Sequence, residues 1–252
     1  MIRLILFIAT LALSVICNAQ VLETRNVSDF TQIHSSSGVN VYYTQSSTKS
    51  IRVESDNQEK VNQIVTEVKG GKLKIYVKST KEKWGKDTTF KVLKVYVSAP
   101  NITAFKSDSG SSLTLENNVS SDSKIGIDVS SGSSIKGNIS AKSIKIEAGS
   151  GASYKGKIAA TSVSVKLDSG SSVSLSGKTD FIEIETDSGA SFSGKDLTVK
   201  SAVVEAESTS SVTLTVTESI KASADSLAKI NYYGNPKNTD KKSSSLGEVI
   251  QK

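Results

Sequence analysis

The feature that most constrains this chain is a Ser-Gly pair that returns about every twenty residues through the C-terminal two thirds. The clearest copies are centred on Gly110, Gly132, Gly151, Gly170 and Gly189. Their spacings are 22, 19, 19 and 19 residues, and degenerate copies follow at Thr209 and Leu227. A fixed period of this length is typical of solenoids, in which each unit buries its apolar face only by stacking on its neighbours.

Apolar and polar residues alternate on both sides of each Ser-Gly pair. In the copy at Gly170, the apolar positions before the glycine are Val163, Val165 and Leu167, and those after it are Val173 and Leu175. A period of two is typical of strands with one buried and one wet face. Each copy therefore predicts a strand, a corner and a second strand.

Similar corners at nearly constant spacing predict strands that stack in parallel, coil upon coil. The predicted fold is an all-β, right-handed parallel β-helix with coils of 19–22 residues, its hand taken from the rule for parallel crossovers. Val165, Ile184 and Val204 are then expected to lie one above another. Glycine suits corners that need a positive φ, and the predicted structural corners are Gly38, Gly110, Gly132, Gly151, Gly170 and Gly189. The alternative, a low-complexity linker, does not account for an aligned apolar alternation.

Residues 1–19 have the pattern of a secretory signal peptide, with Arg3, an apolar run over 4–16 and a small-residue cleavage site ending at Ala19. The apolar run is too short for a typical membrane span. We therefore expect no transmembrane segment in the mature chain, and export to the periplasm, the outer-membrane surface or the extracellular space. Cys17 raises the alternative of a bacterial lipoprotein, although Ile16 does not fit the small residue that such processing needs.

The rest of the chain divides into four predicted segments. Residues 20–44 form an N-terminal β segment with the first Ser-Gly corner. Residues 45–100 interrupt the repeat with further strands and a short amphipathic helix over 57–68, and are expected either to cover one end of the solenoid or to pack alongside it. Residues 101–234 carry the repetitive β-helix, and residues 235–252 form a polar tail or a cap.

Several segments together resemble a known family. They are Ser-Gly-Val-Asn-Val-Tyr-Tyr-Thr-Gln at 37–45, Ile-Val-Thr-Glu-Val at 64–68 leading into Leu-Lys-Ile at 73–75, the Asp-Ser-Gly-Ser-Ser corners, and Tyr-Gly-Asn-Pro at 233–236. Across nearly all of the mature chain, this combination is similar to the putative auto-transporter adhesin, head GIN domain proteins, an exported family of Bacteroidetes. The resemblance implies a β-helical exported domain without a catalytic motif, and the adhesin name of the family is itself an inference by analogy.

Composition weighs against nucleic acid as a partner. The chain has 31 Lys and Arg residues against 25 Asp and Glu, but only 6% aromatic residues and no basic helix, so it lacks the means to stack bases. Its lysines are spread along the predicted wet faces, as at Lys155, Lys157 and Lys195, which favours weak contact with anionic surfaces.

The sequence has few side chains that could serve in catalysis, which argues against an enzyme. Some parallel β-helices are polysaccharide lyases or hydrolases, which place acids and bases in a long groove. Here the single histidine is His34, beside the N-terminal corner, and the mature chain has only Arg25 and Arg52 to stabilise a developing negative charge. We therefore predict no catalytic residue and no cofactor.

Carboxylates recur near the corners, and stacking would bring Asp168, Asp187 and Glu207 into one column. One hypothesis is a weak calcium-binding ladder, because hard oxygen ligands suit that ion. The alternative, which we favour, is corner capping, in which each side chain accepts hydrogen bonds from the amides that follow it. No metal site is therefore predicted.

The leading functional hypothesis is a non-enzymatic exported module that presents repeated Ser, Thr and Lys side chains to a glycan or another cell-surface polymer. Weak contacts that repeat along a polymer sum through multivalency. The alternative is a structural envelope component whose solenoids scaffold or stack end to end. The sequence predicts no oligomeric state.

Overall fold

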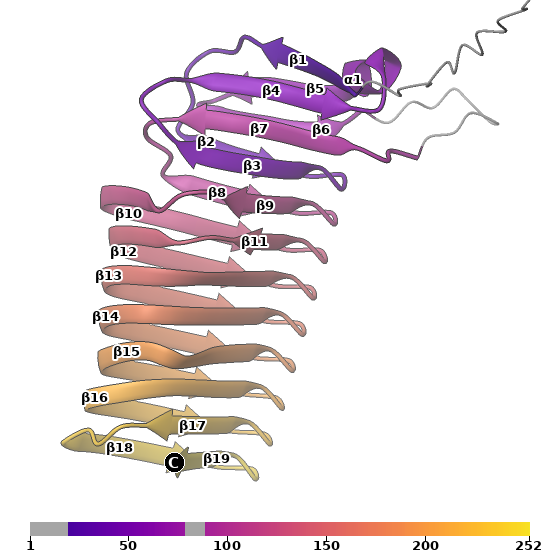
Figure 1. Ribbon diagram of the computed structural model, residues 1–252. Helices are drawn as coiled ribbons and strands as arrows, with labels where there is room; N and C mark the ends of the chain where they lie inside the picture. The colour runs from indigo at the N-terminus through magenta and orange to yellow at the C-terminus, as the bar shows by residue number, and fades with distance from the viewer. Residues whose placement is uncertain (1–19, 79–88) are drawn as a thin grey trace, which may run out of the picture.

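The computed structural model describes residues 20–78 and 89–252 and is almost entirely β-structure. It is a β-solenoid of about 8 turns with coils about 19 residues apart, which confirms the predicted fold class (Figure 1). The elements are β1 (Val21–Arg25), β2 (Gln32–Ser35), β3 (Asn40–Gln45), β4 (Ser50–Ser55), α1 (Gln58–Gln63), β5 (Ile64–Lys69), β6 (Lys72–Val77), β7 (Leu93–Ala99), β8 (Ala104–Ser107), β9 (Ser112–Leu115), β10 (Val119–Val129), β11 (Ser134–Lys136), β12 (Ile139–Ala148), β13 (Ser153–Leu167), β14 (Ser172–Thr186), β15 (Ser191–Ala206), β16 (Ser211–Ala224), β17 (Lys229–Tyr233), β18 (Asn238–Ser243) and β19 (Glu248–Gln251). The predicted signal peptide, residues 1–19, lies outside the described residues.

The Ser-Gly corners are tight turns that reverse the chain between two facing layers of strands. At one of them, Ser169 has φ 49° and Gly170 has φ 69°, while the amide of Ser171 donates to the carbonyl of Asp168 at 3.0 Å. Two successive positive φ values with this bond define a type I′ turn. The amide of Gly170 also donates to the carbonyl of Ser188 in the next coil at 3.0 Å. Hydrogen bonds thus link the corners as well as the strands.

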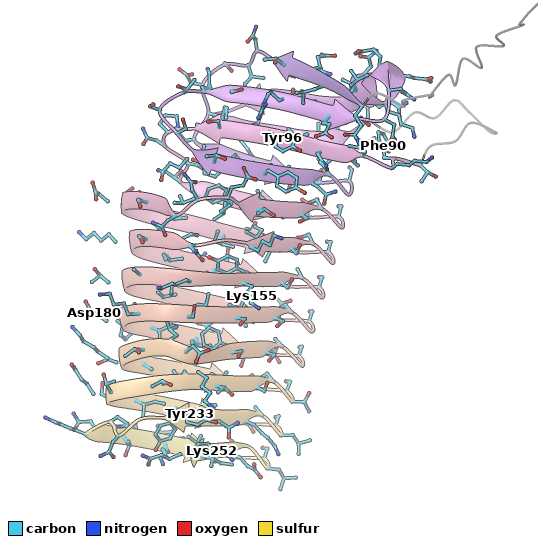
Figure 2. The ribbon with its side chains drawn as sticks, viewed as in Figure 1. Phe90, Tyr96, Lys155, Asp180, Tyr233 and Lys252 are labelled. Carbon is cyan, nitrogen blue, oxygen red and sulfur yellow. The ribbon has the colours of Figure 1, made fainter. Side chains whose placement is uncertain are left out.

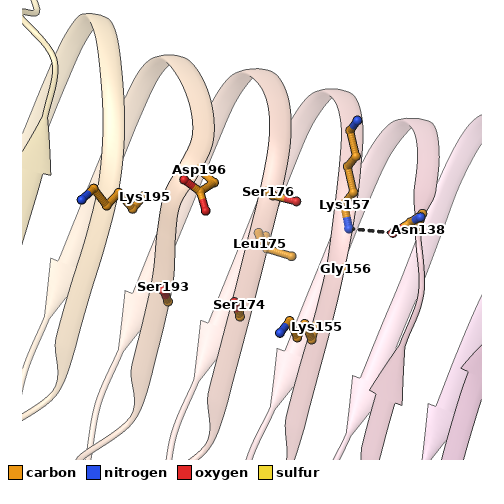
Figure 3. A pocket seen from close by; sticks show the side chains of 10 residues that line it. All are labelled: Asn138, Lys155, Gly156, Lys157, Ser174, Leu175, Ser176, Ser193, Lys195 and Asp196. Atoms are coloured by element: carbon orange, nitrogen blue, oxygen red, sulfur yellow. Dashed lines mark hydrogen bonds between the residues drawn. The ribbon is translucent and has the colours of Figure 1, made fainter.

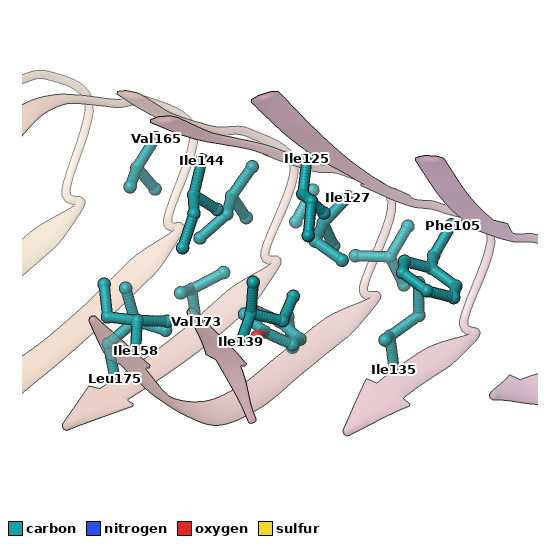
Figure 4. Close-up of a cluster of buried hydrophobic side chains, with 14 of the residues drawn as sticks. Phe105, Ile125, Ile127, Ile135, Ile139, Ile144, Ile158, Val165, Val173 and Leu175 are labelled. Carbon is teal, nitrogen blue, oxygen red and sulfur yellow. The ribbon is translucent and has the colours of Figure 1, made fainter. Parts of the chain in front are cut away.

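The core consists of apolar columns that run along the solenoid axis. Val165 pairs in parallel register with Ile184, and Ile184 with Val204, so these side chains lie one above another as predicted. All three are at most 1% exposed. Figure 4 shows the facing column of the other layer, with Val173 and Leu175 packed into the same interior. Burying each such side chain contributes about 1.5–3 kcal/mol.

The segment 45–100 covers the N-terminal end of the solenoid. β6 stacks in parallel on β2 and β7 on β3, and the antiparallel strands β5, β4 and β1 extend the two layers beyond them (Figure 1). Helix α1 lies at this end and buries Val61. The insertion therefore continues the core rather than packing alongside it.

The helix predicted over 57–68 is correct only in its first half. The side chain of Asn57 caps it by accepting from the amide of Lys60 at 3.0 Å, but α1 ends at Gln63. Ile64 has φ −83° and ψ 116°, and from there β5 pairs with β6. The β-branched residues of 64–68 favour a strand, and pairing with a neighbouring strand outweighs their helical spacing.

Residues 235–252 form one further coil instead of a frayed tail. β18 pairs with β16 and β19 with β17, both in parallel. Lys241 takes the inward-facing position in register with the buried Ala222 but is itself exposed at the end of the solenoid, and its ammonium group lies 4.8 Å from the ring centroid of Tyr232. An inward-pointing charged side chain is a known way to protect an exposed edge strand. No helix in the described part of the chain is long and apolar enough to cross a membrane.

Candidate binding face

The strands that follow the corners carry an outward surface of hydroxyl and amino groups, here named the serine–lysine face. Its first column is an unbroken series of serines in parallel register on six successive coils. They are Ser112, Ser134, Ser153, Ser172, Ser191 and Ser211. The hydroxyl of Ser211 donates to that of Ser191 at 3.2 Å. Alternation puts these side chains outside because the residues on either side of them, such as Ala190 and Phe192, are buried.

A second column of the same face contains Lys136 and Lys155, followed by Ser174 and Ser193. Figure 2 shows the side chains that project from the coils, with Lys155 labelled among them. The column holds more hydroxyl and ammonium groups than carboxylates, so this face is suited to hydrogen-bond acceptors and anions.

A hollow of about 420 Å³ interrupts the serine–lysine face (Figure 3). Its lining comes from four successive coils: Asn138, Lys155, Gly156, Lys157, Ser174, Leu175, Ser176, Ser193, Lys195 and Asp196. Asn138 holds one wall, because its side-chain oxygen accepts from the amide of Lys157 at 3.0 Å. Gly156 lines the hollow with its backbone, because the side chain it lacks would point toward the Gly137 carbonyl and the buried Tyr154 ring.

A β-bulge in β15 shapes the hollow. The strand pairs run from Ser174–Ser193 directly to Gly177–Leu197, so β15 has one residue more than β14 over this stretch. On the other side of β15, the pairing with β16 resumes only at Thr198. The additional residues include Lys195 and Asp196. Bulges of this kind bend a strand and redirect its side chains, and they recur beside functional sites.

The strands before the corners carry a second surface, the carboxylate face, which is richer in acids. Its acidic residues on the central coils are Asp128, Glu147, Asp168, Glu183, Glu185, Asp187, Glu205 and Glu207. Lysines on this face are largely neutralised, as in Lys145–Glu147 at 2.6 Å and Lys166–Glu185 at 2.9 Å. The two outer faces of the solenoid thus differ in charge.

The predicted carboxylate column forms along a groove of about 300 Å³ that contains Asp168, Asp187 and Glu207. No three His, Cys, Asp or Glu side chains among residues 20–78 and 89–252 converge as a metal site would require. Asp187 instead accepts from the amide of Ser188 at 2.5 Å. Hydrogen bonds from the Ser208 side chain and the Ser188 amide hold the pKa of Asp187 below its usual value. This arrangement favours corner capping over the calcium ladder.

The residues considered for catalysis do not gather at one place. The Nε2 atom of His34 lies 2.6 Å from Asp108, whereas Arg25 pairs with Glu23 at 2.7 Å. Burial alone would raise the pKa of Asp108, but hydrogen bonds from His34 and Ser109 lower it overall. Arg52 lies 5.4 Å over the ring of Tyr96. The positions of His34, Arg25 and Arg52 indicate that these side chains make structural contacts.

An aromatic stack at the N-terminal end of the serine–lysine face was not predicted. The rings of Tyr42 and Tyr96 lie 5.3 Å apart at 22°, because β3 and β7 pair in register there. The two tyrosines are far apart in the sequence, Tyr42 just before the insertion and Tyr96 in its last strand. Only the alternation in each strand, which points both rings outward, could have indicated the pair.

The family model described as "Putative auto-transporter adhesin, head GIN domain" matches residues 29–236. Among curated proteins, none matches the sequence. Two solved structures from Parabacteroides each have a TM-score of 0.84 and cover 92% of this chain and 96% of their own. They are a putative lipid binding protein of P. distasonis ATCC 8503, 18% identical, and a putative adhesin of P. merdae ATCC 43184, 13% identical. A putative adhesin of Bacteroides fragilis NCTC 9343 is 18% identical, with a TM-score of 0.67, and covers 93% of this chain and 97% of its own. At these identities the likeness establishes a shared fold.

Proposed function

Because the chain belongs to the putative auto-transporter adhesin, head GIN domain family, we propose that it is an exported, non-enzymatic module whose serine–lysine face binds an extended glycan or another surface polymer. The observation that carries this proposal is the column of six serines in register. Parallel strands lie about 4.8 Å apart, so the column presents one hydroxyl per coil along the solenoid axis. A polymer lying along that axis meets the same chemical group repeatedly.

Weak contacts are sufficient to bind a polymer when the same contact repeats on successive coils. A single hydrogen bond contributes about 1 kcal/mol, which is too little to keep a ligand bound. Once one sugar unit is bound, the next is already close to the following coil, and the effective concentration of later contacts is high. The flat strands hold the hydroxyls in place before binding, which lowers the entropic cost.

The family and the similar structures carry descriptions of adhesins or of a binding protein, which supports binding over catalysis. The groove on the carboxylate face does bring Lys166 near several acids. However, Lys166 is held by Glu185, and the pKa of Asp187 is lowered. Glycoside hydrolysis needs a general acid with a raised pKa. The lowered pKa of Asp187 does not fit that role, and its carboxylate is suited to accepting hydrogen bonds.

A panel of bacterial and host polysaccharides tests the proposal, with the wild-type protein compared with Ser172→Gln and Ser164→Gln. Both substitutions add the same side chain to an outward strand position, the first on the serine–lysine face and the second on the carboxylate face. We expect Ser172→Gln to weaken binding about tenfold or more and Ser164→Gln to leave it unchanged. A blank panel, or equal losses in both variants, would contradict the proposal.

A further inference from the structure

The hollow on the serine–lysine face has an unusual charge for a surface depression. Three of its lining residues are lysines, Lys155, Lys157 and Lys195, and only Asp196 is acidic. Two lysines come from β13 and one from the bulge in β15, so they stand on opposite sides of β14, and the ammonium group of Lys195 is turned toward Tyr233 of β17. Ser174 and Ser176 of β14 lie between them (Figure 3).

Within residues 20–78 and 89–252, the lysines of the hollow form no ion pair. Neither Lys155 nor Lys157 has an ion-pair partner for its ammonium group among the described residues. The ammonium group of Lys195 lies 4.8 Å from the ring centroid of Tyr233, a contact that orients the side chain and keeps its charge. On the carboxylate face, by contrast, Lys145 and Lys166 are both paired with glutamates.

Positive charges held around a depression attract an anion, and neighbouring hydroxyls add hydrogen bonds to it. We infer that this hollow binds the carboxylate of an acidic sugar unit, and that the polymer bound by the serine–lysine face is therefore an acidic polysaccharide. The inference rests on the proposed function, and it specifies the class of polymer.

The lining favours a sugar over a lipid headgroup. Leu175 is the only large apolar side chain in the hollow, and it is buried, so an acyl chain finds little surface there. Serine hydroxyls and the Asn138 amide can instead bond the hydroxyls of a pyranose ring. The serine column beside the hollow extends the same chemistry to the next sugar units.

Calorimetric titration with polygalacturonate and with its fully methyl-esterified form tests the inference, because esterification replaces each carboxylate by a neutral methyl ester and keeps the same sugar backbone. We expect the acidic polymer to bind at least about tenfold more tightly at low salt, and the difference to shrink as salt screens the lysines. Lys155→Gln, Lys157→Gln and Lys195→Gln should each weaken binding of the acidic form by roughly threefold. The matched controls Lys145→Gln and Lys166→Gln, on the carboxylate face, should leave it unchanged.

The outcomes separate this inference from the function on which it rests. Equal binding of both polymers, with no effect of the three lysine substitutions, would overturn the acidic-sugar site and leave the serine column in place. Binding to phosphatidylglycerol vesicles but to neither polymer would also overturn it. If neither polymer binds and the polysaccharide panel is blank, both proposals fail.

Discussion

The phenol oxygen of Tyr154 lies 2.8 Å from the point that a Cβ atom on Gly156 would occupy. The same oxygen donates to the carbonyl of Gly137 in the adjacent coil at 3.2 Å. A large ring in one core position is therefore accommodated by the missing side chain two residues later. Phe192 and Gly194 repeat the arrangement, with a ring carbon 2.7 Å from the hypothetical Cβ. Large and small residues thus alternate along a strand to fill a core of constant width.

Gly156→Ala should destabilise the solenoid. Its Cβ would lie 2.0 Å from the backbone oxygen of Gly137, which cannot move without disturbing the adjacent coil. We expect a loss of about 1–3 kcal/mol in the free energy of unfolding, measured by urea denaturation. Gly126→Ala is the control, because its nearest neighbour would be the Cβ of Ala104 at 3.8 Å, an ordinary contact. Equal effects of the two substitutions would contradict this account of the packing.

Leu227→Gly should stabilise the protein. Leu227 holds φ 67° at a corner where most copies have glycine, and 53% of its surface is exposed, so the change sacrifices little packing. Relief of left-handed strain, less the entropic cost of glycine, should raise the free energy of unfolding by about 0.5–1 kcal/mol.

The reverse change, Gly170→Ala, should lower the free energy of unfolding by about 1 kcal/mol, because alanine is strained at φ 69°. A clash does not contribute, since the added Cβ would have no neighbour within 4 Å. Thermal unfolding of both variants checks the pair. Shifts of the same sign would show that φ is not the cause.

Acid should weaken the corners. Hydrogen bonds from the Ser245 side chain and the Ser226 amide lower the pKa of Asp225, as bonds from Ser208 and Ser188 lower that of Asp187. A folded pKa below the unfolded value gives stability that is present above the ordinary aspartate pKa and is lost as the pH falls through the folded pKa.

The variant Asp187→Asn/Asp225→Asn should therefore lose less stability than the wild type between neutral pH and the acid range below the ordinary aspartate pKa. Urea midpoints across that range measure the slopes. An unchanged slope would mean that these two carboxylates do not contribute to the acid sensitivity.

Lys241→Leu should promote association of the protein through its C-terminal end. Lys241 takes an inward-facing but exposed position in the last coil, where its charge discourages another strand from adding to the open edge. Lys242→Leu makes the same change at an outward position beside Ser223 and should leave the protein unaffected. Sedimentation velocity over a range of concentrations distinguishes the two. Association of both variants, or of neither, would rule out this role for Lys241.

Calcium should not raise the melting temperature. Asp187 accepts from the Ser188 amide at 2.5 Å, so at least one of the carboxylates in the column already serves a corner. A differential scanning measurement with and without millimolar calcium tests this. A saturable rise that disappears in Asp187→Asn would instead support the ladder hypothesis for Asp168, Asp187 and Glu207.

The sequence alone determined the repeat, the strand faces and the core columns. A period of two around a recurrent corner is a local property of each strand, and near-constant spacing leaves few ways to stack Val165, Ile184 and Val204 other than in register. Tertiary structure decided where the helix after Asn57 ends, because at Ile64 pairing with β6 outweighs a local helical pattern. It also decided the hollow, since a bulge depends on the count of residues in two neighbouring strands and here puts Lys155 of β13 and Lys195 of β15 on the lining of one hollow. A strand or a corner depends on residues that are consecutive in the sequence, whereas a binding surface depends on which coils lie side by side.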